Sequence, residues 1–107
     1  MKKMNKKHNN RLYVLVDETL EPVYGAVQGG HCVAQYMLDN KNNPGAWNNE
    51  YLIYLSANVE LWKQILKMKH KKFSEFHEPD LNNKLTSICL VDSGRLFKQL
   101  PLLRANK

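Results

Sequence analysis

The sequence predicts an α/β sandwich in which strands and helices follow one another in the order βαβαββα. The apolar runs of residues 12–16 and 51–56 have the composition of strands buried in a sheet. Segments with apolar residues at helical spacing lie between the strands, over residues 25–40 and 61–68. Alternation of strands with helices is typical of α/β folds, and the right-handed crossover rule makes at least the first two strands parallel.

The first half of the chain divides at polar segments. The first strand ends at Asp17, and a polar loop that contains Pro22 is expected over residues 18–24. Helical spacing predicts that the first helix begins near Gly25 and ends near Asn40. Residues 41–49 are rich in Asn, Pro and Gly, so they are expected to form an irregular connector to the second strand.

The second half begins with a helix that Asn58 is expected to cap, with Glu60 in its first turn. One side of this helix is apolar and the other basic; the apolar stripe comprises Leu61, Trp62, Ile65, Leu66 and Met68, and the opposite side Lys63, Lys67, His70 and Lys71. Strands are expected over residues 73–77 and 85–91, joined by a polar loop. A turn over residues 92–94 and a short helix over residues 95–100, broken by Pro101, close the fold.

Length and hydropathy predict one soluble domain. The chain has 107 residues, of which 43% are hydrophobic, and this suffices for a single core. Residues 1–10 are polar and basic without periodicity, so we expect a disordered leader followed by one domain over residues 11–107. No apolar run reaches the length of about 18 residues that a membrane span needs, and no signal core follows the N-terminus. A cytoplasmic protein without membrane contact is expected.

The net charge of +6 comes from the two ends of the chain. Nine of the sixteen Lys and Arg residues lie before residue 12 or after residue 92, without an acidic neighbour in either segment. Residues 12–92 carry seven Lys against all ten acidic residues, so the middle of the chain is slightly acidic. Basic ends favour encounters with phosphate polymers, although they also serve solubility alone.

No metal or cofactor is expected. Cys32 and Cys89 are too few for a four-ligand zinc site or a disulfide scaffold, and both lie in apolar runs, which predicts buried free thiols. The four histidines show no metal-ligand spacing. Cys32 next to His31 does not form a catalytic pair, because neighbouring side chains of a helix point about 100° apart.

The passage from the first strand into the first helix is the best candidate for a ligand site. Helix N-terminal amides at the carboxyl end of a strand attract anions, and Gly25, Gly29 and Gly30 would let a ligand come close. Gly29 and Gly30, with Ala34, could instead let the helix pack closely on the sheet. The run is neither a dinucleotide fingerprint nor a P-loop.

Two further features carry polar groups. The loop at residues 78–80 and the following Thr86 place carboxylates and a hydroxyl near a strand start, where they could orient a water molecule or simply stabilise a turn. The row of Lys63, Lys67 and Lys71 could contact phosphates or form the solvated face of its helix.

At these residues the sequence resembles the type II peptidyl-tRNA hydrolase superfamily. The family helix has the form G-K-x-x-A-Q-x-x-H-A, and the corresponding run here is residues 25–34, GAVQGGHCVA. Ala26 stands in place of the family lysine, Gly30 in place of the glutamine and Val33 near the histidine, with His31 two positions away. The likeness extends over residues 11–103 and is closer to the divergent, hydrolase-domain-containing branch that also lacks the lysine.

The resemblance implies a three-layer fold with a mixed four-stranded sheet, helices on both faces, and in many members a homodimer. It implies tRNA or peptidyl-tRNA as partner and hydrolysis of the ester between peptide and tRNA. In this reading Asp80 orients the attacking water, Thr86 contacts the substrate, and His31 with the amides near Gly25 stabilises the developing charge. Residues assigned to substrate binding are Gly25, Ala26, Gln28, Lys63 and Lys67.

The sequence is compatible with three functions. The first is a peptidyl-tRNA hydrolase-like enzyme, in which alanine at position 26 removes an ammonium group that could hold a phosphate or an oxyanion. The second is a non-catalytic nucleic-acid or protein interaction module of the same fold. The third is an unrelated small-ligand site at the start of the first helix.

Overall fold

The computed structural model describes residues 11–98. The expected leader and the part of the expected closing helix beyond residue 98 lie outside this range. The main elements in chain order are β1 (Arg11–Asp17), α1 (Pro22–Asp39), β2 (Tyr51–Ala57), α2 (Val59–Met68), β3 (Ser74–Glu78) and β4 (Lys84–Asp92). Short 3-10 turns, η2 (Pro79–Leu81) and η3 (Arg95–Phe97), follow β3 and β4.

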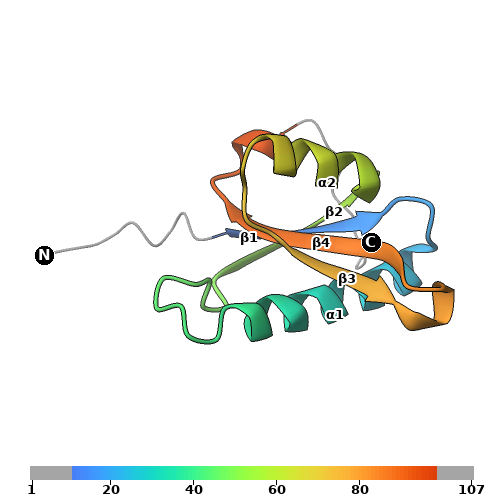
Figure 1. The fold of residues 1–107 in the computed structure, drawn as a ribbon, viewed down its shortest axis with the longest axis horizontal. Helices are drawn as coiled ribbons and strands as arrows, with labels where there is room; N and C mark the ends of the chain where they lie inside the picture. Colours follow the sequence, from blue (N-terminus) through green and yellow to red (C-terminus); the bar gives the residue numbers. More distant parts are fainter. Residues whose placement is uncertain (1–10, 99–107) are drawn as a thin grey trace, which may run out of the picture.

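The four strands form one mixed sheet in the order β2-β1-β4-β3, and the predicted α/β class is confirmed. β1 and β2 are parallel, as the crossover through α1 predicts. β4 lies between β1 and β3 and is antiparallel to both. α1 lies on one side of the sheet and α2 on the other (Figure 1).

β1 separates two parts of the core. Leu12, Val14 and Val16 belong to the cluster beneath α1, whereas Tyr13 and Leu15 belong to the cluster beneath α2. Because successive side chains of a strand point to opposite faces, a strand covered on both faces is apolar at every position. The two cysteines are buried and free, as predicted.

α1 begins at Pro22, three residues earlier than expected, so the prediction that Pro22 lies in a loop was wrong. Proline suits the first turn of a helix, because its fixed φ is helical and the N–H it lacks would have no partner there. The Gly25 N–H consequently donates to the Glu21 carbonyl oxygen at 2.7 Å, within the helix. This earlier start changes which amide groups are free at the helix end.

α2 is capped as predicted: the Leu61 N–H donates to Oδ1 of Asn58 at 3.0 Å. Its buried face differs from the predicted stripe, because Leu61 and Met68 are 50% and 78% exposed. Val59 and Leu66 are buried, and Trp62 packs against the same cluster. Their spacing of three and four residues forms a contact face that leaves Leu61 and Met68 on its outer side.

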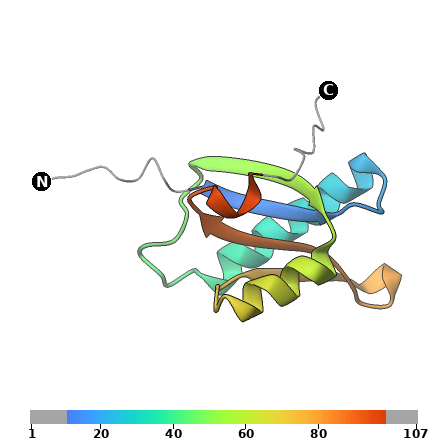
Figure 2. The same ribbon diagram turned by 90° about the horizontal axis from the view of Figure 1, so that it is seen from above.

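The chain closes over α2 with a turn in place of the first part of the predicted helix 95–100. η3 spans only three residues, and its Phe97 ring lies 4.7 Å from the Tyr13 ring and 5.0 Å from the Trp62 ring. Figure 2 shows this turn on the α2 side of the sheet. None of the helices within residues 11–98 combines the length and hydropathy needed to cross a membrane.

Candidate functional site

Gln28 is the centre of a hydrogen-bonded cluster between α1 and the sheet. Its side chain is only 1% exposed. Its Oε1 accepts a hydrogen bond from the Thr86 hydroxyl at 2.7 Å, and its Nε2 donates to Oε1 of Glu78 at 2.7 Å. A buried amide with both ends engaged has one orientation, so Gln28 holds the Glu78 carboxylate in a fixed place.

Close packing of α1 on the sheet puts Gln28 within reach of Thr86. A Cβ atom at Gly29 would lie 2.6 Å from Cε2 of Tyr54 and 3.0 Å from Cγ1 of Val14, and one at Gly25 would lie 2.8 Å from Cγ1 of Val16. The packing role proposed for these glycines is therefore confirmed at Gly29. It is wrong at Gly30, where a Cβ would meet open space, and at the exposed Ala34.

A β-bulge brings Thr86 to the same side of the sheet as Gln28. The pairing of β3 with β4 shifts between Phe76 and His77, so Phe76 pairs with Ser87 while His77 pairs with Leu85. Thr86 is left as the extra residue of the bulge, and Leu85 instead packs into the α2-side core. Strict alternation from Ser87 would have pointed Thr86 toward α2.

Glu78 is the carboxylate that this cluster presents to solvent. Its Oε1 accepts from Gln28, and its Oε2 accepts from the Asp80 backbone N–H at 3.1 Å. The Asp80 N–H and the Gln28 amide lower the pKa of Glu78 below its ordinary value. Glu78 is therefore an ionised, oriented acceptor.

His31 and Tyr24 form the open side of the cluster. The His31 ring is stacked on the Phe76 ring, with centroids 4.8 Å apart and an interplanar angle of 10°. Partial desolvation and the negative charges of Glu78 and Asp80 raise the pKa of Tyr24. Tyr24, Gln28 and His31 follow at spacings of four and three residues on one face of α1, which directs all three toward Glu78.

A second carboxylate, Asp17, lies at the same end of the sheet and has a structural role. Asp17 ends β1 and accepts hydrogen bonds from the N–H and the hydroxyl of Thr19 at 2.9 and 2.8 Å. Its other oxygen lies 3.1 Å from Nζ of Lys84. Asp17 is buried, unlike Glu78, and both its carboxylate oxygens are occupied by the chain itself, so it stabilises the turn into α1.

The structure brings together four of the residues that the sequence assigned to the site: Gln28, His31, Asp80 and Thr86. Thr86 is fully buried, and its hydroxyl donates a hydrogen bond to Gln28. Thr86 therefore positions the Gln28 side chain and does not reach a ligand. The Asp80 side chain is exposed beside Glu78.

The other four assigned residues stand apart from the expected roles. The Gly25 N–H is occupied by Glu21, so it is not free to stabilise a negative charge as predicted, and Ala26 has no polar side chain. Lys63 and Lys67 lie on α2, which covers the opposite face of the sheet (Figure 1). Nζ of Lys63 is 3.1 Å from Oε1 of Glu75.

Sequence reasoning gave no role to Tyr24 and did not single out Glu78 within its loop. The helical spacing of Tyr24, Gln28 and His31 was the available signal, but the expected helix start at Gly25 left Tyr24 outside it. Glu78 could not be distinguished from Asp80 without the bulge and the Gln28 contact.

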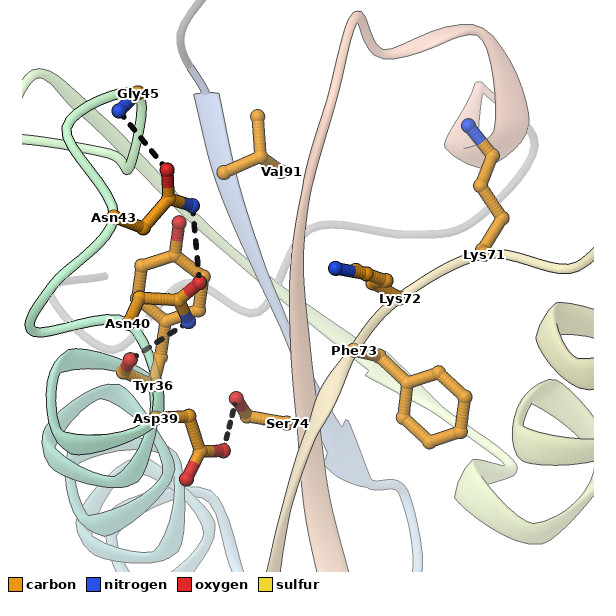
Figure 3. A pocket seen from close by; sticks show the side chains of 10 residues that line it. All are labelled: Tyr36, Asp39, Asn40, Asn43, Gly45, Lys71, Lys72, Phe73, Ser74 and Val91. Atoms are coloured by element: carbon orange, nitrogen blue, oxygen red, sulfur yellow. Dashed lines mark hydrogen bonds between the residues drawn. The ribbon is translucent and has the colours of Figure 1, made fainter.

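A separate groove of about 560 Å³ lies at the carboxyl end of α1. Figure 3 shows its two walls: one carries Tyr36, Asp39, Asn40 and Asn43, and the other carries Lys71, Lys72 and Phe73. Ser74 and Val91 lie between the walls. Ser74 is on the same strand as Glu78, so groove and cluster share the seam between α1 and β3.

Comparison with known proteins finds no family model and no curated protein that matches the chain. Among residues 11–98 there is also no group of three or more side chains that could hold a metal ion.

Proposed function

We propose that the protein is a peptidyl-tRNA hydrolase-like enzyme that binds peptidyl-tRNA and hydrolyses the ester between the peptide and the tRNA. The observation that supports it is the chain of hydrogen bonds from Thr86 through Gln28 to Glu78, which ends in an ionised carboxylate beside the exposed His31. Glu78 ends β3 and His31 lies in the middle of α1, and a carboxylate next to an imidazole is an arrangement suited to water activation.

In the proposed reaction His31 removes a proton from water, and the water oxygen attacks the ester carbonyl carbon. The Glu78 carboxylate stabilises the imidazolium that results. Collapse of the tetrahedral intermediate breaks the bond to the ribose oxygen, and His31 returns the proton to that oxygen. Asp80, exposed at the rim, orients the water, as the sequence suggested.

The negative oxygen of the intermediate needs donors that the chain does not use internally. α1 begins at Pro22, so the N–H groups of Val23 and Tyr24 belong to its first turn, where helical acceptors are missing. The Tyr24 hydroxyl is a further donor, and its raised pKa keeps it protonated. These groups take the place of a lysine that the chain lacks at Ala26.

The test is release of the N-acetylated amino acid from an N-acetylated aminoacyl-tRNA, a minimal peptidyl-tRNA, by the purified full chain. We expect turnover, and a loss of about a hundredfold or more in rate for His31→Ala, which removes the base, and for Glu78→Gln, which removes the charge that stabilises the imidazolium. Glu18→Gln is the matched control, because Glu18 is an exposed carboxylate after β1 outside the cluster.

Retention of full rate in both variants would contradict the assignment of the site. Absence of turnover by the parent chain would contradict the enzyme, and salt-sensitive tRNA binding in that case would indicate the non-catalytic interaction module.

A further inference from the structure

The groove at the carboxyl end of α1 differs from a bare apolar pocket in its distribution of charge. Lys72 points into the space between the walls (Figure 3). Among residues 11–98 its ammonium group has neither a hydrogen-bond nor an ion-pair partner, whereas Lys71 lies 3.2 Å from Oδ1 of Asp92. Lys72 is thus an uncompensated cation in a concave site.

The basic wall belongs to a dense run of positive charge. Residues 67–72 contain four lysines and no acidic residue, although residues 12–92 as a whole carry a negative balance. This concentration favours a ligand with negative charge, because a cationic surface beside a groove raises the local concentration of anions.

The opposite wall presents amide and carboxylate groups. Asp39 accepts from the Ser74 hydroxyl at 2.7 Å and from Nε2 of Gln35 at 2.8 Å, at the edge of the groove. Nδ2 of Asn40 donates to the Tyr36 carbonyl oxygen at 2.9 Å, and Oδ1 of Asn40 accepts from Asn43 at 3.3 Å. Each amide nitrogen retains a second hydrogen for a ligand.

A bare anion does not fit both walls, because Asp39 and the carbonyl end of α1 repel it. A nucleotide does: its phosphate can face Lys72, and its base edge, which carries amino donors and ring acceptors, can face Asp39, Asn40 and Asn43. The exposed Val91 offers an apolar surface between them. We propose that this groove binds a nucleoside phosphate.

Two sources could supply that group, a free mononucleotide or one residue of a single-stranded RNA. The distance along the seam between the Gln28 cluster and the groove can be spanned by a short single-stranded RNA. Gln28 and Asp39 are eleven residues apart on α1, or about 16 Å at 1.5 Å per residue, and Ser74 and Glu78 are about 13 Å apart on β3. The nucleotide site itself does not depend on the proposed hydrolysis.

The experiment is calorimetric titration of the full chain with AMP, adenosine and a short single-stranded RNA. We expect AMP to bind and adenosine to bind at least about tenfold more weakly, since it lacks the charge-assisted contact with Lys72. Lys72→Gln should weaken AMP binding by about tenfold as well. Circular dichroism checks the fold of Lys72→Gln. We expect it to be unchanged, because the Lys72 side chain is exposed and has no partner within residues 11–98.

Lys69→Gln is the matched control, because Lys69 is exposed in the same basic run but does not line the groove. It should leave the dissociation constant for AMP within about twofold. RNA that binds more tightly than AMP and is displaced by it would identify a nucleic-acid chain as the source, and RNA no tighter than AMP would identify the free nucleotide. Failure of AMP to bind, equal binding of adenosine, or equal effects of Lys69→Gln and Lys72→Gln would overturn the proposal.

Discussion

Oε1 of Gln28 accepts the Thr86 hydroxyl at 2.7 Å in a part of the interior that excludes water from both side chains. The two residues are 58 positions apart in the chain, so this bond joins α1 to β4. It also orients the amide that donates to Glu78. Stability and site geometry therefore depend on the same contact.

Thr86→Val should lower the free energy of unfolding by about 1–3 kcal/mol, because it keeps the shape of the side chain but leaves Oε1 of Gln28 buried without a donor. Urea unfolding measures the change. Thr86→Ser keeps the hydroxyl and should lose only about 1 kcal/mol for the missing methyl group. No loss in Thr86→Val would show that the hydrogen bond does not stabilise the fold, because this variant keeps the methyl group.

The bond between Gln28 and Thr86 also marks the limit of what the sequence could predict. The strands of residues 12–16 and 51–56 were predictable because burial on both faces makes a strand apolar throughout. Gln28 lies on the buried face of α1, where a polar side chain is unexpected. Its hydrogen-bond partner Thr86 points toward it only because of the β-bulge. One residue of bulge reverses the side to which Thr86 points, and alternation in the sequence does not reveal it.

The start of α1 shows the same limit at a helix end. Pro22 is compatible both with a loop and with the first turn of a helix, and the polar residues around it favoured the loop. The three-residue difference decides whether Gly25 has a free N–H and whether Tyr24 belongs to the helix. The expectation of a free N–H at Gly25 was wrong because it depended on the first turn of α1, whereas Gln28 and His31 lie within the helix by either start.

The ionisation of Glu78 should respond to Gln28. Gln28→Leu removes a donor from Oε1 and should raise the pKa of Glu78 toward its ordinary value, while the Asp80 N–H bond keeps it from reaching that value. Carbon-13 NMR of the carboxyl group measures this titration. Gln35→Leu is the control, since Gln35 lies on the same helix and donates to Asp39. An unchanged Glu78 pKa in Gln28→Leu would contradict the proposed orientation of the carboxylate.

Asp17 should make stability depend on pH. Desolvation by burial opposes its ionisation, but hydrogen bonds from Thr19 and the bond and charge of Lys84 outweigh this and lower its pKa. A carboxyl group with a lowered folded-state pKa contributes stability above its unfolded value of about 4, and loses it as the pH falls through the folded value.

Asp17→Asn should therefore destabilise the protein by about 1–3 kcal/mol at neutral pH, and the difference from the parent chain should shrink in acid. Urea unfolding over a pH series gives both values. Glu18→Gln changes an exposed neighbouring carboxylate and should stay within about 0.5 kcal/mol of the parent at every pH. A pH-independent loss in Asp17→Asn would mean that shape, and not charge, stabilises this turn.

Gly29 and Gly30 should respond in opposite ways to the same substitution. Gly29→Ala places a Cβ 2.6 Å from the Tyr54 ring and 3.0 Å from the buried Val14, so α1 must move outward. Overpacking of this kind costs about 1–3 kcal/mol, only partly offset by the helix propensity of alanine. Gly30→Ala meets open space and should raise the free energy of unfolding by about 0.5–1 kcal/mol.

The two alanine variants also separate helix position from helix stability at the site. Because Gln28 precedes Gly29, an outward shift of α1 lengthens its bonds to Thr86 and Glu78, so Gly29→Ala should raise the pKa of Glu78 and slow any ester hydrolysis. Gly30→Ala should leave both unchanged while making the fold more stable. Urea unfolding, the Glu78 titration and the peptidyl-tRNA assay on the same two proteins measure these effects. Similar behaviour of the two variants would show that close contact between α1 and the sheet does not position Gln28.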